Sequence, residues 1–263
     1  MRENMVRSIW ARGDAVVNGW LSIPSSFSAE VMAHQGFDSL VIDMQHGLVD
    51  YQAAVTMLQA ISTTPVVPLV RVPWNDPAHL MKVLDAGAYG VICPMINTRD
   101  QAEALVRACR YAPRGVRSFG PTRAHLYGGD DYAERANDEI LVMPMIETVE
   151  ALENLDEILA TPGVDAAYVG PADLSLSMGK EPRVDHTDPQ LVEVQRTIVA
   201  ACQRHGVVAA IHAGTAEYAL KMIEDGYRLV TVGSDSHLLA LGAAARVAAV
   251  RTGLPGVRSQ VGD

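Results

Sequence analysis

The most constraining feature of the sequence is a repeating order of segments along its whole length. Short runs rich in apolar and β-branched residues alternate with longer segments whose apolar residues recur at helical spacing. This pattern is typical of a parallel sheet, in which each strand is buried on both faces and a helix returns the chain to the starting edge. We predict eight strands, at Val16–Leu21, Ser39–Asp43, Val66–Val72, Gly90–Met95, Ile140–Ile146, Ala166–Gly170, Val207–Ile211 and Leu229–Gly233.

A segment with helical spacing follows each predicted strand, and several of these segments carry recognisable ends. Asp76 precedes Pro77, which places a capping carboxylate before a first-turn proline. Gly36, Gly87 and other glycines stand where a left-handed cap would end a helix. The predicted helices are Ser28–Gln35, Tyr51–Ile61, Pro77–Ala86, Arg99–Tyr111, Val149–Leu159, Leu191–His205, Ala216–Asp225 and His237–Arg251.

Eight strand–helix units in a chain of 263 residues fit a closed (β/α)8 TIM barrel of the α/β class. An open dinucleotide-binding sheet would need a G-x-G-x-x-G motif after its first strand, and the sequence has none. No change in composition marks a linker. We therefore predict one domain over residues 1–263, with an N-terminal extension or helix at 1–14 and a C-terminal tail at 252–263.

Two segments rich in proline and glycine interrupt the pattern, at residues 112–129 and 175–189. We expect both to be long loops between a strand and the following helix. Such loops cover the face of a barrel where the catalytic groups gather. Arg114, Arg117 and Arg123 form a basic cluster in the first loop. This cluster would recruit an acidic substrate or contact a neighbouring subunit.

Composition and charge exclude several functional classes. The chain has 21 Lys and Arg against 31 Asp and Glu, and it has no basic run that would follow a phosphate backbone, so we expect no nucleic-acid partner. No segment approaches the roughly 18 apolar residues that span a bilayer, and the N-terminus lacks a signal-peptide core, so we expect a cytoplasmic protein with no membrane partner. The three cysteines are too far apart to indicate a disulfide framework or a zinc site.

Polar residues follow the predicted strands where the strands end, and the carboxyl ends of barrel strands meet at one mouth. Glu147 and Asp173 end neighbouring strands, so their carboxylates are expected to lie close together. Two like charges at this distance are costly unless a cation lies between them. The pair therefore suggests a divalent metal site of the Mg²⁺ or Mn²⁺ kind, and helix capping or pairing with arginine is the alternative.

Four further features mark the same mouth. His46 follows an apolar strand and is a candidate general base, or a structural histidine. Arg71 ends a buried strand and needs an anionic ligand or an internal carboxylate. The turn Gly170-Pro171-Ala172-Asp173 offers backbone N–H groups to an anion, or is a plain tight turn. His212 and Asp235 are weaker candidates, expected to support the residues of the site or to fix neighbouring loops.

These residues belong to six ordered motifs that together resemble the HpcH/HpaI family of class II, metal-dependent pyruvate aldolases. The likeness covers residues 5 to 250. It is carried by Ile42–Gly47, Val70–Pro77, Pro94–Met95, Arg110–Arg117, Ile146–Thr148 and Val169–Ser175.

The resemblance implies a role for each matching residue. Glu147 and Asp173 would bind a divalent metal ion (Mg²⁺, Mn²⁺ or Co²⁺), His46 would accept the proton, and Arg71 would stabilise the developing enolate oxygen. The backbone amides of Ala172 and Asp173, in the turn that includes Gly170 and Pro171, would hold the pyruvate carboxylate. The resemblance also assigns to Asp85 the role of raising the basicity of His46. The sequence alone favours Asp43 for that role, so both stay candidates.

The family's fold is a (β/α)8 barrel whose last helix is often exchanged between subunits. The resemblance therefore implies a homo-oligomer, a hexamer built as a trimer of dimers. Two positions depart from the family pattern. Met145 stands where many members have glutamine, and Gln45 stands where many have glutamate. Both changes leave the presumed metal ligands intact, and both bear on which substrate is bound.

The sequence thus predicts an aldehyde-lyase that reversibly cleaves 4-hydroxy-2-oxo acids to pyruvate, or hydroxypyruvate, and an aldehyde. One alternative is a lyase for CoA esters of malate-like acids, which would need the basic loop at Arg114–Arg123 to bind a nucleotide. Another is a phosphosugar isomerase or synthase that uses Gly233 and Ser234 in a phosphate site. A non-catalytic barrel that binds a ligand is the third.

Overall fold

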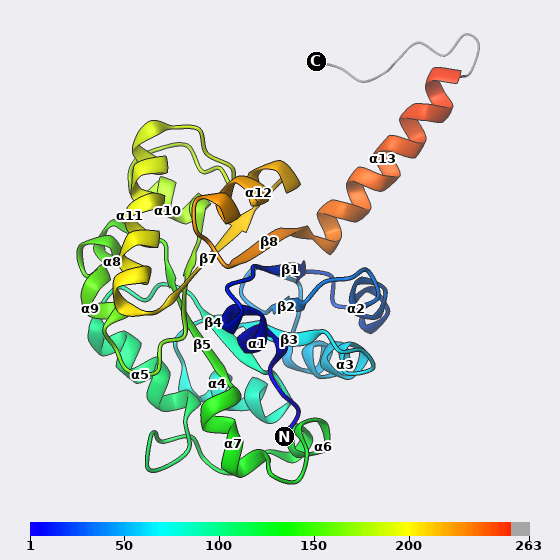
Figure 1. Cartoon of the computed structure of the whole chain (residues 1–263). Coiled ribbons are helices and arrows are strands. Elements are labelled where there is room, and N and C mark those ends of the chain that lie inside the picture. The colour runs from blue at the N-terminus through cyan, green and yellow to red at the C-terminus, as the bar shows by residue number, and fades with distance from the viewer. Residues whose placement is uncertain (254–263) are drawn as a thin grey trace.

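The computed structural model describes residues 1–253 of the chain. Its centre is a closed barrel of parallel strands in the order β1 to β8, which confirms the predicted (β/α)8 fold (Figure 1). The strands are β1 Val16–Leu21, β2 Ser39–Asp43, β3 Val67–Arg71, β4 Gly90–Cys93, β5 Leu141–Ile146, β6 Ala166–Val169, β7 Val208–Ala213 and β8 Leu229–Ser234.

Apolar side chains fill both sides of the barrel wall. One cluster lies inside the barrel and includes Val16, Val41, Leu69 and Met143. A larger cluster joins the outer face of the strands to the surrounding helices. Burial on both faces explains why the strands read as nearly continuous apolar runs.

Helices surround the barrel, and side chains cap most of their N-termini. Asp50, Asp76 and Thr98 are three of these caps, and each accepts a hydrogen bond from a first-turn backbone N–H. The helices are α1 Met5–Ala11, α2 Ser26–Ala33, α3 Tyr51–Ile61, α4 Pro77–Asp85, α5 Arg99–Cys109, α6 Thr122–Gly128, α7 Tyr132–Glu139, α8 Val149–Glu153, α9 Leu155–Leu159, α10 Pro171–Ser177, α11 Pro189–His205, α12 Ala216–Glu224 and α13 Asp235–Gly253.

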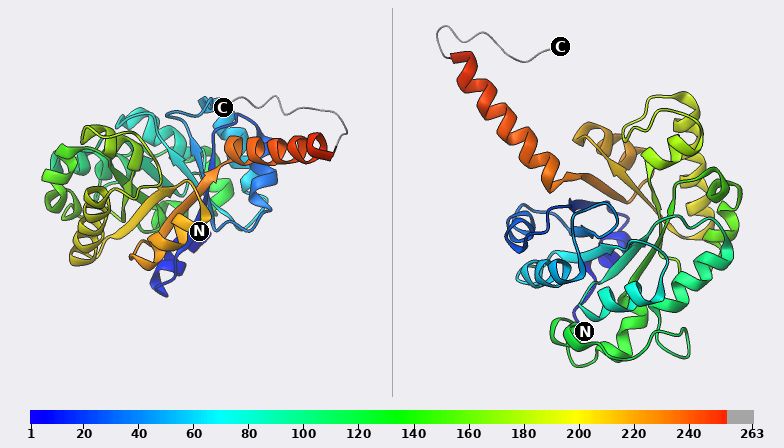
Figure 2. Two further views of the ribbon diagram at one scale, coloured as in Figure 1. Left: turned by 90° about the horizontal axis from the view of Figure 1, so that it is seen from above. Right: turned by 180° about the vertical axis from the view of Figure 1, so that it is seen from behind.

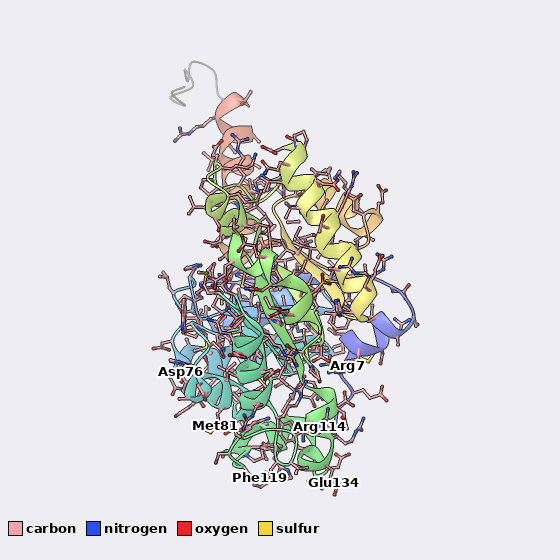
Figure 3. All side chains as sticks on the ribbon, turned by 90° about the vertical axis from the view of Figure 1, so that its left-hand side faces the viewer. Arg7, Asp76, Met81, Arg114, Phe119 and Glu134 are labelled. Atoms are coloured by element: carbon pink, nitrogen blue, oxygen red, sulfur yellow. The ribbon has the colours of Figure 1, made fainter. Side chains whose placement is uncertain are left out.

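The N-terminal helix α1 covers the end of the barrel at which the strands begin. Val6 and Ile9 are buried in the inner cluster, and Trp10 donates a hydrogen bond to the carbonyl of Arg228. Arg7 of α1 and Asp76, which caps α4 after β3, lie on opposite sides of the molecule in Figure 3. The other end, where the strands finish, is therefore the open mouth.

The first of the two interrupted segments is not a loop at the mouth, so the prediction for residues 112–129 was wrong. It follows α5 and precedes β5, which makes it a helix-to-strand connection, and it contains α6, with α7 close behind. Its arginines are held internally: Arg114 pairs with Asp138, Arg117 with Asp85, and Arg123 with the carbonyl of Ala86. The second segment does follow β6 at the mouth, but α10 occupies its start.

The last helix, α13, extends away from the barrel instead of covering it (Figures 1 and 2). Of its 19 residues only Asp235 is buried. Leu238, Leu239, Leu241 and Val250 are all exposed. Within residues 1–253, no helix is both long enough and apolar enough to cross a membrane.

Candidate active site

A pocket of about 190 Å³ opens at the mouth of the barrel and collects most of the predicted site residues. It is lined by residues from the ends of β1, β3, β5, β6 and β7, from the start of α10, and from the loops that follow β2, β6 and α10. Its lining residues are Trp20, His46, Arg71, Met145, Tyr168, Gly170, Pro171, Ala172, Asp173, Val184 and His212.

Asp43 and Arg71 form a buried ion pair in this site, because the β2–β3 register places them side by side. The guanidinium donates Nε–H to Oδ1 at 2.8 Å and Nη2–H to Oδ2 at 2.7 Å. Trp20 adds an Nε1–H bond of 3.2 Å to Oδ2 and lies beneath the guanidinium. Burial alone would raise the pKa of Asp43, but the bonds and charge of Arg71 lower it below its usual value.

Asp43 also fixes the loop that carries His46. Its Oδ1 accepts the backbone N–H groups of Gln45 and His46, at 3.1 and 3.3 Å. Gly47 packs against the Asp43 carbonyl so closely that any Cβ there would clash. The imidazole of His46 is exposed at the pocket. In this chain Asp43 therefore contacts the His46 backbone and orients Arg71, and no bond joins its carboxylate to the imidazole.

Asp85, the other candidate partner of His46, lies outside the pocket. It is the last residue of α4, the helix that follows β3, and it is not among the residues that line the pocket. Arg117 donates to its carboxylate at 2.7 Å, and burial raises the pKa of Asp85. Within a single chain, the structure thus places Asp85 with Arg117 and does not bring it to His46.

Glu147 lies at the end of β5, with only 2% of its surface exposed. Its Oε1 accepts the backbone N–H of Met95 at 2.8 Å, and Met95 adopts a left-handed φ of 57° to aim that group. Burial raises the pKa of Glu147 to about 7, and the nearby charge of Asp173 adds to this effect. A carboxylate held in this way is costly unless a cation accompanies it.

The space around Glu147 fits a divalent cation. Among the described residues no donor bonds to Glu147 Oε2, and Gly170 leaves room beside it, since a Cβ there would lie 2.5 Å from that oxygen. No cluster of three metal-binding side chains occurs within residues 1–253. Glu147 and the exposed Asp173 would therefore be the only two side-chain ligands there. Such a set of hard oxygens leaves coordination positions for water and substrate, as Mg²⁺, Mn²⁺ and Co²⁺ accept.

The turn between β6 and α10 forms the adjoining wall of the pocket. Pro171 begins the helix, and the N–H of Leu174 makes the first helical bond, to the carbonyl of Gly170. The N–H groups of Ala172 and Asp173 precede this bond, so they have no helical acceptor. They are free to meet an anionic group in the pocket.

Sequence reasoning missed Trp20, Tyr168 and Val184 as parts of this pocket. In the sequence Trp20 and Tyr168 are aromatic members of apolar strands, and Val184 lies in the loop after α10. The missing signal is geometric, because inward-facing positions near strand ends share one mouth. Asp235 has the expected loop-fixing role: its carboxylate accepts bonds from Ser22 and Ser28.

Comparison with known proteins identifies the family of the chain. The model of the HpcH/HpaI aldolase/citrate lyase family matches residues 19–241. A hydroxypyruvate/pyruvate aldolase of Rhizorhabdus wittichii is 41% identical over 92% of this chain and 96% of its own. A 4-hydroxy-2-oxo-heptane-1,7-dioate aldolase of Escherichia coli is 38% identical over 97% of this chain and 99% of its own.

Solved structures show the same kinship. An HpcH/HpaI aldolase/citrate lyase family protein from Burkholderia cenocepacia superposes with a TM-score of 0.88. It is 33% identical, and the match covers 95% of this chain and 99% of that one. The fold and these relatives place the chain in the aldolase and lyase class of barrels. The chain belongs to the HpcH/HpaI aldolase/citrate lyase family.

Proposed function

We propose that this protein is a class II aldolase that reversibly cleaves 4-hydroxy-2-oxo acids to pyruvate, or hydroxypyruvate, and an aldehyde. One observation carries the proposal: buried Glu147, the Asp43–Arg71 pair and exposed His46 meet at one mouth. The relatives at 41% and 38% identity, both named aldolases, support it.

Each residue of the site has a separate role in binding the substrate or stabilising its charge. Glu147 and Asp173 would hold a divalent cation, which would supply Lewis acidity for formation of the enolate. Arg71 stabilises the negative charge that develops on the enolate oxygen, and Asp43 fixes its guanidinium in that direction. The backbone N–H groups of Ala172 and Asp173 hold the substrate carboxylate.

His46 moves the proton in both directions. In cleavage it accepts the proton of the C4 hydroxyl as the bond between C3 and C4 breaks, and it then returns that proton to C3 of the enolate to give pyruvate. In synthesis it removes a proton from the pyruvate methyl group, the enolate attacks the aldehyde carbon, and the new C4 alkoxide takes the proton back. The exposure of its imidazole leaves it free to reach either atom.

Cleavage of a simple substrate tests this function. Purified protein with Mn²⁺ or Mg²⁺ is expected to release pyruvate from 4-hydroxy-2-oxopentanoate, measured by NMR as growth of the pyruvate methyl signal. Chelator is expected to stop the release and added metal to restore it. Folded protein that releases no pyruvate with any of the three metal ions, from this or a longer 4-hydroxy-2-oxo acid, would contradict the proposal.

The position of the basic cluster weighs against a CoA-ester lyase. Arg114, Arg117 and Arg123 belong to the helix-to-strand connection, away from the pocket, and each already has a protein partner. They therefore offer no nucleotide groove beside the site.

We also propose that the protein is a homo-oligomer in which α13 packs on a second copy, within the hexamer that its family resemblance implies. An isolated helix of this length with exposed Leu239, Leu241 and Val250 is unstable in water, because most helical stability comes from burying an apolar face. No element of residues 1–253 covers these side chains.

Charged residues on α13 test the assembly. Leu241→Glu with Val250→Glu is expected to reduce the molecular mass measured by light scattering, because each charge would be buried without a partner. Leu220→Glu, on the exposed face of α12, is the matched control and should keep the wild-type mass. A double variant with the wild-type mass would exclude this role for α13.

A further inference from the structure

A chain of hydrogen bonds runs through the interior of the barrel and ends at the pocket. Ser39 Oγ donates to Asn18 Oδ1 at 2.7 Å, and Asn18 Nδ2 donates to Thr231 Oγ1 at 2.8 Å. Thr231 Oγ1 lies 2.7 Å from the hydroxyl of Tyr168, which lies 3.3 Å from Nδ1 of His212. Ser39, Asn18 and Thr231 are fully buried, and Tyr168 is nearly so.

One arrangement of protons satisfies every group in this chain. Asn18 donates through Nδ2 to Thr231, Thr231 donates to Tyr168, and Tyr168 donates to Nδ1 of His212. In this arrangement Nδ1 is an acceptor, and the neutral imidazole carries its ring proton on Nε2.

The surroundings keep His212 neutral. Burial and the positive charge of Arg71 lower its pKa to about 4. Its ring meets the edge of Trp20 with centroids 5.0 Å apart, and Trp20 also lies beneath the guanidinium of Arg71. His212 is thus part of the same packed layer as the Asp43–Arg71 pair.

The Nε2 group of His212 has no hydrogen-bond partner among the described residues, although His212 lines the pocket. The nearby walls offer little polarity: Met145, Val184 and the ring of Trp20 line the same space. The keto oxygen of the substrate is already assigned to Arg71 and to the cation that Glu147 and Asp173 would hold. The substrate carboxylate is assigned to the backbone amides that follow Gly170. His212 is left as the remaining neutral donor in the pocket.

We propose that the Nε2–H of His212 binds a hydroxyl oxygen of the substrate and makes this enzyme prefer hydroxylated substrates. The oxygen is the C3 hydroxyl of a hydroxypyruvate donor or the hydroxyl of a hydroxyaldehyde acceptor. This inference rests on the proposed aldolase function. A neutral donor suits a hydroxyl, and a bound substrate without a hydroxyl would cover the N–H and leave it unpaired, which lowers its relative rate.

Tyr168 has a positioning role in this scheme. It does not need to touch the substrate, because its proton on Nδ1 selects the tautomer that presents Nε2–H. Tyr168→Phe removes that selection and leaves the imidazole in place. Tyr168→Phe is therefore expected to reduce the preference for hydroxylated substrates, but by less than loss of the His212 donor does.

The test measures carbon–carbon bond formation with four substrate pairs, in the fully metallated enzyme. Pyruvate or hydroxypyruvate is combined with propanal or glycolaldehyde, and kcat/KM is compared within each arm. The measured quantity is the ratio for the hydroxylated against the plain substrate, because general damage to the site affects both rates and cancels. His212→Phe keeps an aromatic ring against Trp20 but loses the donor, whereas His212→Gln places an amide N–H near the position of Nε2.

His212→Phe is expected to lower the ratio about tenfold in one arm, the loss of one hydrogen bond, and His212→Gln is expected to recover most of it. The donor arm would identify the C3 hydroxyl, and the acceptor arm the aldehyde hydroxyl. If wild type forms products and the ratios of His212→Phe equal those of wild type in both arms, the role of His212 would be overturned. No product from any pair in wild type would overturn the proposed function, and this inference with it.

Discussion

Glu147→Gln is expected to lower turnover by roughly a thousandfold or more. The substitution keeps the size of the side chain and an oxygen for the Met95 N–H, but it removes the charge that would hold the cation. Loss of Lewis acidity at the keto oxygen is worth several kcal/mol of barrier, and each 1.4 kcal/mol is about tenfold in rate. The measurement is kcat/KM for aldol cleavage at saturating metal.

Glu150→Gln is the matched control, because Glu150 is an exposed carboxylate three residues further on. It should keep wild-type turnover and metal affinity. A Glu147→Gln protein with near-normal, metal-dependent turnover would exclude Glu147 as a ligand.

In the absence of metal, the buried charge of Glu147 is expected to make the stability of the wild-type protein depend on pH. Because the folded state raises the pKa of Glu147 from 4.5 to about 7, the ionised form is penalised. Wild type should therefore lose stability as the pH rises from about 4.5 through 7, by up to about 3 kcal/mol, and Glu147→Gln should not. Thermal unfolding in chelator at pH 5 and pH 8 measures the difference, and equal pH profiles for the two proteins would contradict this electrostatic account.

Arg71→Ala is expected to reduce both activity and stability. Activity should fall about a hundredfold to a thousandfold, because the charge beside the reacting oxygen is lost. Stability should fall by about 3–5 kcal/mol, because the carboxylate of Asp43 stays buried with its strongest partner gone. The stability effect follows from the two short bonds to Asp43.

A second substitution separates the two effects. Adding Asp43→Asn removes the unpaired charge, so the Arg71→Ala/Asp43→Asn protein should regain much of the stability and none of the activity. Arg114→Ala, which breaks the exposed pair with Asp138, is the control and should change stability by less than about 1 kcal/mol. If the double variant regains activity together with stability, Arg71 is structural and not catalytic.

The barrel was predictable from the sequence because each of its strands and helices has a pattern that is visible within a short segment. Each strand is buried on both faces, so each reads as an apolar run, and the polar residues at strand ends had to converge once the barrel closed. The order of elements also shows why the segment at 112–129 was misplaced. Without α6 and α7 recognised, a long irregular stretch looked like a loop at the mouth.

The pairings within the site were less predictable, because they depend on register and depth. The sequence marked Asp43 and Arg71 separately, but only the β2–β3 register shows that they bind each other. The same limit applies to Asn18 and Thr231. Each is a polar residue flanked by apolar ones in its strand, and their connection to His212 crosses the barrel interior.

The path of α13 was not predictable from one chain. Its apolar residues indicate a helix, but they do not determine whether the helix packs on the barrel of its own chain or on that of a second copy. The role assigned to Asp85 has the same limit, because Asp85 lies apart from His46 in a single chain. It stays a prediction that an oligomer structure can test.

The most direct test of the account is deuterium exchange into the methyl group of pyruvate, followed by NMR. It needs no knowledge of the aldehyde. We predict that chelated enzyme shows no exchange, that Mn²⁺ or Mg²⁺ restores it, and that Glu147→Gln and Arg71→Ala remain slow at saturating metal. Exchange that is equally fast without metal, or that survives Glu147→Gln, would contradict a metal-assisted enolate at this pocket.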